Sequence, residues 1–161
     1  MSILLIHWTG EHHLRNKNGP TDLVFFLFAD HLGSTNVTSD PNGLMVSLSL
    51  YKPWGESRGG AGTRLTDYGF TGQREMGNSV GLIYYGARFY DSALGRFAQP
   101  DTIVPQASQG VQAWDRFAYV NNSPIKHNDP KGHACGTATP GDPGCGGGAG
   151  DIGDCGSECW W

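Results

Sequence analysis

Hydrophobic residues in this chain fall into short runs of strand length, separated by clusters of turn-forming residues. Residues 23–28 form a continuous apolar run rich in β-branched and aromatic side chains, a pattern typical of a strand buried on both faces. The polar stretch 30–34 interrupts this run, and an extended pattern resumes over residues 35–38. From Val46 to Tyr51 apolar and polar residues alternate, which predicts a half-buried strand.

Turn signals join these runs into hairpins. Asp-Pro-Asn-Gly at residues 40–43 combines a proline that presets φ with an Asn-Gly pair that tolerates positive φ. Residues 52–56 end the next strand, and the glycines at residues 59–62 predict a loop. Further short strands are expected near residues 68–71 and 82–90. The whole pattern predicts a mainly β fold, an antiparallel hairpin meander followed by an irregular closing segment.

The composition agrees with many short elements and divides the chain into three regions. With 161 residues, 38% hydrophobic, 16% charged, 25 Gly and 9 Pro, it suits strands joined by turns better than long amphipathic helices. We expect a poorly ordered segment at residues 1–20, one domain at residues 21–132 and a variable low-complexity tail at residues 133–161. The tail has nine Gly among 29 residues, which predicts disorder.

The charge distribution excludes two classes of partner. Eleven basic residues balance eleven acidic ones up to residue 132, and the tail adds four acids and no base. Such a chain has no basic surface for nucleic acid or for an anionic membrane. No apolar run approaches the roughly 20 residues that a membrane-spanning helix needs, and the first residues do not resemble a signal peptide.

All four cysteines lie in the last 27 residues, and three interpretations of them stay open. They are idle thiols in a disordered tail, disulfides with three possible connectivities, or ligands of a zinc ion together with His133. Only one pair has ordinary ligand spacing, so no metal or other cofactor is predicted. The four are Cys135, Cys145, Cys155 and Cys159.

An ordered series of short motifs carries a family resemblance. The segments 70–75, 81–91 and 95–97 closely resemble the signature of the Rhs repeat-associated core domain, the closing segment of Rhs/YD-repeat shell proteins. Further pieces of the same pattern extend the resemblance over roughly residues 25–133. They are residues 28–35, 51–56, 99–102, 117–124 and 129–132.

The resemblance implies a structural protein of a polymorphic toxin system. In this bacterial family a long β-sheet winds into a hollow shell, the core domain plugs one end, and the segment after Asp-Pro-x-Gly is a variable extension, often a toxin. The chain would then be a cap or plug segment, a truncated or remnant member without its own toxin. Its partners would be upstream Rhs/YD repeats of a larger shell protein or further copies of itself. Intact relatives are secreted or at the cell surface, so a cell-surface interaction module is an alternative function.

A second alternative is self-cleavage, although no conventional enzyme is predicted. Some relatives use core-domain aspartates as an aspartyl protease that cuts after the closing Asp-Pro-x-Gly, because two close carboxylates can serve as base and acid on one water. The matching position is Asp101, with Arg96 nearby in sequence and Asp129 or Asp115 as the second carboxylate. His133 stands where the cleaving relatives have Leu, and the aspartates could equally be turn or cap residues.

The physical role expected for the motif residues is structural. Aromatic rings pack across neighbouring strands, glycines permit tight reversals, and turn aspartates accept backbone N–H bonds that the strand ladder leaves over. The aromatic side chains should therefore form stripes across the sheet. These are Tyr84, Tyr85, Phe89, Tyr90 and Phe97.

Overall fold

The structure is a computed structural model that describes residues 3–8, 11–16, 23–77, 79–102, 114–133 and 136–137. The chain divides into two compact units, Met1–Glu75 and Met76–Trp161. The division inside the expected 21–132 domain is a feature that the hydrophobic pattern did not predict.

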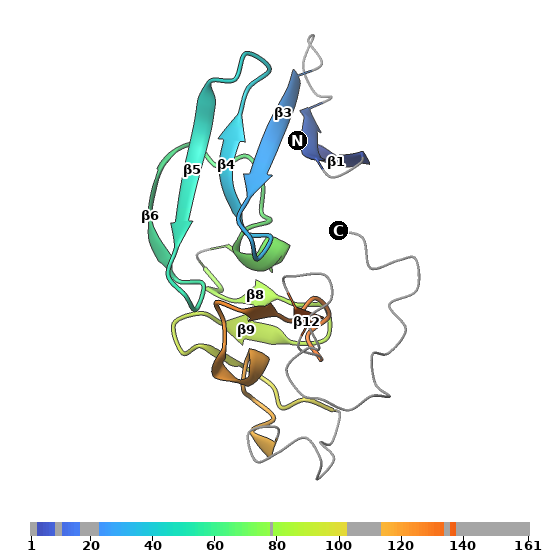
Figure 1. Ribbon diagram of the computed structural model, residues 1–161, viewed down its shortest axis with the longest axis vertical. Coiled ribbons are helices and arrows are strands. Elements are labelled where there is room, and N and C mark those ends of the chain that lie inside the picture. The colour runs from blue at the N-terminus through green and yellow to red at the C-terminus, as the bar shows by residue number, and fades with distance from the viewer. Residues whose placement is uncertain are drawn as a thin grey trace. The chain divides into compact units, whose positions relative to one another are not determined.

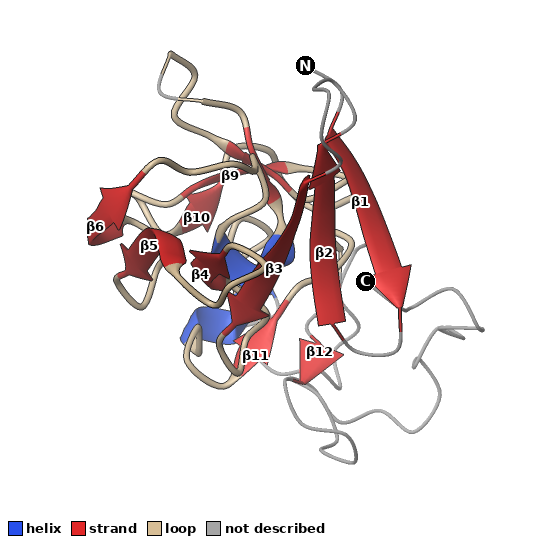
Figure 2. Cartoon of the chain, turned by 90° about the horizontal axis from the view of Figure 1, so that it is seen from above, coloured by secondary structure: helices blue, strands red, loops and turns tan. Residues whose placement is uncertain are grey.

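The first unit contains a six-stranded antiparallel sheet in which every strand pairs with its neighbours in sequence (Figure 1). Seen from above, β1, β2 and β3 lie side by side (Figure 2). This meander confirms the prediction of a mainly antiparallel β fold. Its strands are β1 (Ile3–Trp8), β2 (Glu11–Asn16), β3 (Leu23–Ala29), β4 (Thr35–Ser39), β5 (Met45–Tyr51) and β6 (Ser57–Gly62).

Two strands lie in the segment for which the sequence predicted little order. β1 and β2 both fall within residues 1–20, and β2 pairs with β3 from His12↔Leu27 to Asn16↔Leu23. Strand pairing satisfies backbone donors and acceptors whatever the side chains are. A polar sequence beside a strong apolar strand can therefore extend the sheet, which the hydrophobic pattern alone does not predict.

The glycine-rich stretch at residues 59–62 is part of β6 and not the predicted loop. A Cβ on Gly60 would lie 2.4 Å from the Leu48 carbonyl oxygen, and one on Gly62 would lie 2.0 Å from that of Val46. The glycines therefore allow β6 to approach the backbone of β5 closely.

An isolated bridge and a 3-10 turn stand where the sequence predicted a strand near residues 68–71. Tyr68 forms one isolated bridge with Arg74, and the 3-10 turn η1 (Phe70–Gly72) follows it. Within η1, Thr71 has φ 49° and Gly72 has φ 71°, so the chain reverses there. The two-residue strand β7 (Arg74–Glu75) closes this unit.

Turn aspartates accept backbone N–H groups as the sequence predicted. Asp30 Oδ1 accepts hydrogen bonds from the N–H groups of Leu32 and Ser34, both at 2.9 Å. Asp40 Oδ1 accepts two more hydrogen bonds in the β4–β5 turn, from the N–H groups of Asn42 and Leu44. The bond from Leu44 is the main cause that lowers the pKa of Asp40. These side chains fix the hairpin reversals locally.

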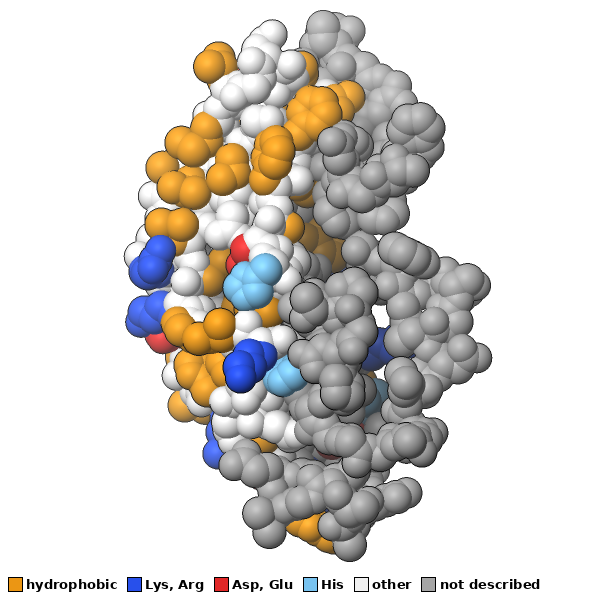
Figure 3. Space-filling model, in the orientation of Figure 1, with side chains coloured by type: hydrophobic (Ala, Val, Ile, Leu, Met, Phe, Trp, Pro, Cys, Tyr) orange, Lys and Arg blue, Asp and Glu red, His pale blue; other side chains and the backbone are white. Residues whose placement is uncertain are grey.

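The two faces of the sheet are not equally buried, although the sequence predicted that the strand at residues 23–28 is buried on both. Leu27, Thr38 and Ser47 are aligned across three strands and are buried. The adjacent row on the other face contains Phe28, which is 55% exposed, opposite Val37. The apolar run in β3 is therefore not buried on both faces. Figure 3 shows hydrophobic side chains gathered over the part of the surface where Figure 1 places β3 to β5.

The second unit is built around a small antiparallel meander and two further short elements. β8 (Ile83–Tyr84), β9 (Phe89–Asp91) and β10 (Arg96–Phe97) pair in order. A 3-10 turn, η4 (Val120–Asn122), and a hairpin of β11 (His127–Asn128) with β12 (Gly136–Thr137) follow.

Four aromatic rings form the core of this unit. Tyr85, Tyr90 and Tyr119 are 0% exposed and Phe97 is 3% exposed, with Tyr85 edge-on to the other three at centroid distances of 5.5–5.7 Å. The Tyr85 hydroxyl donates to that of Tyr119 at 3.1 Å. The expected aromatic stripe is thus divided, because Tyr84, which is exposed, packs with Phe89 in a separate pair.

No helix in the described parts of the chain is long and apolar enough to span a membrane.

Candidate functional site

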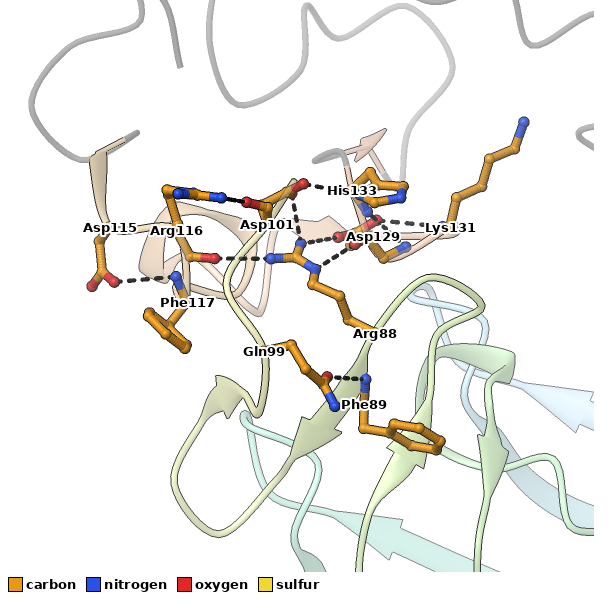
Figure 4. Close-up of polar contacts among 11 residues, drawn as sticks. Arg88, Phe89, Gln99, Asp101, Asp115, Arg116, Phe117, Asp129, Lys131 and His133 are labelled. Atoms are coloured by element: carbon orange, nitrogen blue, oxygen red, sulfur yellow. Dashed lines mark hydrogen bonds and ion pairs between the residues drawn. The ribbon is translucent and has the colours of Figure 1, made fainter. Parts of the chain in front are cut away.

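The candidate site is a buried cluster of charged side chains around Arg88 in the second unit (Figure 4). Arg88 follows the reversal after β8, where the Tyr85 N–H donates to the Arg88 carbonyl at 3.0 Å and the Ala87 N–H donates to the Lys131 carbonyl at 3.1 Å. Its guanidinium lies over the Phe97 ring, 3.5 Å from the centroid. The arginine is thereby fixed between the aromatic core and the turn at residues 129–132.

The guanidinium of Arg88 contacts both aspartates that the sequence singled out. Its Nη2 lies 3.0 Å from Asp101 Oδ2 and 3.3 Å from Asp129 Oδ2. Nη1 donates to the Arg116 carbonyl at 3.0 Å, and Nε donates to the Gly132 carbonyl. Burial lowers the pKa of Arg88, and the two carboxylates oppose that effect, so the arginine keeps its charge.

Asp129 organises the turn that leads to Gly132. Its Oδ1 accepts hydrogen bonds from the N–H groups of Lys131, Gly132 and His133 at 3.3, 2.8 and 3.1 Å. Gly132 has φ 77°, and a Cβ there would lie 2.7 Å from the Tyr85 carbonyl oxygen. The Asp-Pro-x-Gly sequence therefore forms a turn whose glycine is required by both conformation and space.

Asp101 is held at both its backbone and its side chain. Its N–H donates to the Arg116 carbonyl at 2.8 Å, and Arg116 Nε donates back to the Asp101 carbonyl at 2.7 Å. Its carboxylate contacts Arg88 through Oδ2 and His133 Nδ1 through Oδ1, the latter at 2.9 Å. Segments around residues 88, 101, 116 and 129–133 thus meet at one point.

The structure brings together two of the three predicted site residues. Asp101 and Asp129 share Arg88, whereas Arg96 pairs with Asp115 at the surface, with side chains 50% and 39% exposed. Asp115, the other candidate for the second carboxylate, is therefore also outside the cluster.

Sequence reasoning missed Arg88, Arg116 and the contact of His133 with Asp101. The one local signal was the position of Arg88, next to two aromatic residues of a predicted strand. A charged residue in such a run needs a buried partner. The partners lie 13 and 41 residues further along the chain, at Asp101 and Asp129, so spacing does not identify them.

The cluster places charged groups at both ends of one peptide bond. Arg88 Nε donates to the Gly132 carbonyl oxygen, and the N–H of His133 donates to Asp129 Oδ1 at 3.1 Å. A guanidinium at a carbonyl oxygen stabilises negative charge that develops there, and a carboxyl at the amide nitrogen can exchange a proton with it. The Gly132–His133 peptide bond is thus held by a charged group at its oxygen and by another at its nitrogen.

Metal ligation has no support among the residues that the structure describes, where no group of three His, Cys, Asp or Glu side chains could hold an ion. The four cysteines of the predicted alternatives lie outside the described residues.

Comparisons with known proteins identify relatives of part of this chain, although no family model matches it. It is 32% identical over 126 residues to Salivary gland surface protein 1 of Aedes aegypti, covering 71% of this chain and 4% of that protein. It is 28% identical over 120 residues to Toxin subunit YenC1 of Yersinia entomophaga, covering 71% of this chain and 12% of that protein.

Two solved structures share the fold. The crystal structure of TcdB2-TccC3 matches 81% of this chain and 6% of that one, with a TM-score of 0.65 and 20% identity. The match to the Tc holotoxin pore of Photorhabdus luminescens covers 87% of this chain and 7% of that one, with a TM-score of 0.65 and 19% identity. The chain therefore has the fold of a segment of these toxin-complex structures, and it spans only a small fraction of the length of each relative.

Proposed function

We propose that this chain is the cap or plug segment of a shell of the Rhs/YD-repeat type, which encloses or presents a polypeptide. The observation that carries the proposal is the sheet of sequentially paired hairpins, because it has the fold of a segment of TcdB2-TccC3. The ordered motif series from residue 25 to residue 133 supports the same function.

The proposed partners are further hairpins of the same kind. β6 is the outermost strand of the sheet on one side, and all six of its residues are exposed. An outermost strand offers backbone donors and acceptors to a neighbour, either an upstream repeat or a second copy. The names of the relatives, a surface protein and a toxin subunit, support a location at the cell surface or outside the cell.

A chimaera tests this function. Residues 25–133 would replace the segment of similar structure in the TcdB2-TccC3 chain, and the product would be treated with protease. We expect a protease-resistant assembly like that of the parent. The matched control carries Gly60→Val and Gly62→Val, which would separate β6 from β5 and should expose the chimaera to cleavage. Equal digestion of both chimaeras would exclude the cap function.

A second candidate function is self-cleavage between Gly132 and His133. It is favoured by a specific observation, the contacts of Arg88 with the carbonyl oxygen and of Asp129 with the N–H of that bond. In this reaction a water adds to the Gly132 carbonyl carbon, the C–N bond breaks, and the water's protons pass through a carboxylate to the new carboxyl and amine ends. Asp101 and Asp129 are the candidate base and acid, and Arg88 stabilises the charge on the carbonyl oxygen.

Intact-mass spectrometry of the purified chain tests self-cleavage. A fragment that ends at Gly132 and disappears in the Asp101→Asn variant would support it. An intact chain in both forms after prolonged incubation would leave the cluster with a purely structural function.

A further inference from the structure

The two outermost strands of the six-stranded sheet run in opposite directions. Among the strands that the structure describes, β1 and β6 lie at its two edges. Every pairing between them is antiparallel, so the chain reverses five times from β1 to β6. Both strands have six residues. A second copy in the same orientation can therefore place its β1 antiparallel to β6 and continue the meander.

A continuous row of paired residues fixes which face of the sheet each edge residue belongs to. The register joins His7 of β1, through the four strands between, to Gly62 of β6. Residues an even number of positions apart on a strand share a face, so Ile3 belongs to the face of His7 and Gly62. Alignment of β6 and β1 end to end sets Gly62 opposite Ile3, which keeps the two faces continuous. Ala61 is then opposite Leu4, and a slip by one residue would exchange the faces.

The residues of the two edges complement each other in size. β6 is exposed along its length and has Gly at residues 59, 60 and 62, with Ala61 as its one apolar side chain. The first four residues of β1 are Ile, Leu, Leu and Ile. Opposite side chains on neighbouring strands stabilise a sheet by packing together, and a glycine has none to pack. Two β6 strands side by side would form few such pairs, so β1 is the better partner for β6.

We propose that residues 59–62 of one copy pair with residues 3–6 of a second copy, head to tail, so that the sheet continues from β6 into β1. This inference rests on the proposed function, which calls for a neighbouring strand at β6, and it names that strand. Arg58 limits the paired length, because the register of β5 with β6 passes from Gly59 to Ser57 and leaves Arg58 as a bulge. Since each copy keeps one open edge, the association adds copies beyond two.

Disulfide cross-linking between copies tests this pairing. Two variants of the whole chain, Ala61→Cys and Leu4→Cys, would be prepared with the four native cysteines replaced by serine, then mixed and treated with a mild copper oxidant. Opposite residues of an antiparallel pair lie close enough for a disulfide. We expect a covalent dimer in the mixture, with residues 61 and 4 joined in its peptide map, and none above background in either variant alone. The matched control mixes Leu4→Cys with Leu44→Cys, at a residue 67% exposed in the β4–β5 turn, and should stay at background.

The possible results separate the inference from the function beneath it. A dimer of Ala61→Cys alone or of Leu4→Cys alone that exceeds the mixed one would overturn head-to-tail pairing. So would a mixture no better than the control while the circular dichroism spectra are unchanged, and a protease-resistant chimaera would then keep the cap function. A cross-linked mixture together with a digested chimaera would overturn the cap function and leave the pairing as self-association alone. Sedimentation velocity of the unmodified chain is a second readout, in which a species no larger than a dimer at every concentration would overturn the inference.

Discussion

Arg88 connects segments of the second unit that are far apart in sequence. Its side chain is 6% exposed, and the carboxylates of Asp101 and Asp129 beside it are 12% and 3% exposed. Burial of three charged groups is tolerated only when they contact one another with good geometry. The arginine is therefore required by the two aspartates whether or not the cluster acts on a peptide bond.

Arg88→Met tests this requirement. The substitution keeps an unbranched chain over the Phe97 ring and leaves two carboxylates buried without the guanidinium. We expect the free energy of unfolding to fall by about 3–5 kcal/mol, measured by urea denaturation. The matched control is Arg96→Met, which breaks an exposed pair with Asp115 and should cost less than about 1 kcal/mol. Equal losses in the two variants would contradict the structural role of the cluster.

Gly132 is a second residue whose identity the cluster fixes. A Cβ there would be 2.7 Å from the Tyr85 carbonyl oxygen, whereas one on Gly81, at φ 70°, would have no heavy atom within 4 Å. Left-handed backbone costs an L-residue about 1–2 kcal/mol at either site. Overpacking adds about 1–3 kcal/mol at Gly132. Gly132→Ala should thus be the more destabilising variant in urea denaturation, and the reverse order would contradict the turn geometry.

The sequence predicted the residues with local roles better than those with distant partners. Asp101 and Asp129 were identified because each stands in a recognisable motif, and the Asp129 turn is built from consecutive residues. Arg96 was named because it lies near Asp101 in sequence, and Arg88 was not considered. In the structure Arg88 reaches Asp129 because the preceding residue, Ala87, donates its N–H to the Lys131 carbonyl in the turn at residues 129–132. Such a contact depends on tertiary packing, which no spacing encodes.

At the scale of elements, the sequence predicted β3, β4 and β5, and it missed β1, β2 and β6. β3, β4 and β5 lie within one residue of their expected ranges from residue 23 onward. β6 was missed because its glycines normally weaken strands. In this sheet the glycines allow β6 to lie close to the backbone of β5, and the sequence of β6 alone does not show how near its partner strand comes. β2 was missed because it is polar and joins the sheet through backbone pairing, and β1 was missed although its first four residues are apolar.

The end of β5 carries a half-buried phenol that makes the first unit sensitive to alkali. The Tyr51 hydroxyl donates to Glu75 Oε1 at 3.3 Å, and Arg64 Nη1 contacts Glu75 Oε2 at 2.5 Å. Burial, with the negative charge of Glu75, raises the pKa of Tyr51 to about 12. In the unfolded chain a tyrosine ionises near about 10.

The pH dependence of stability follows from this difference. Below pH about 10 the phenol is neutral in both states, and its contribution to stability is fully present. Between pH about 10 and about 12 only the unfolded state ionises, so the free energy of unfolding falls as pH rises. Tyr51→Phe should remove this part of the fall in the free energy of unfolding, as measured by urea denaturation from pH 8 to 11.5. Tyr68→Phe, at an exposed tyrosine of the same unit, should not, and equal profiles for the two variants would contradict the burial of Tyr51.

For the whole molecule, the outermost strand and the apolar row of the sheet set the expected behaviour in solution. All six residues of β6 are exposed, and Phe28 is 55% exposed in the row that continues through Val37 and Leu48 to Ala61. A sheet with such an edge pairs readily with another strand. We therefore expect the isolated chain to be marginally stable and to self-associate.

Ala61→Lys tests whether this association runs through β6. A lysine on an outermost strand opposes edge-to-edge pairing because its charge would be brought next to another strand. We expect sedimentation velocity to show a larger monomer fraction for this variant than for the unmodified chain at equal concentration. Thr63→Lys adds the same charge just beyond the end of β6 and should leave association unchanged. If the unmodified chain is instead a monomer at every concentration and melts in one sharp transition, its sheet needs no neighbouring hairpin, and the shell function loses its physical basis.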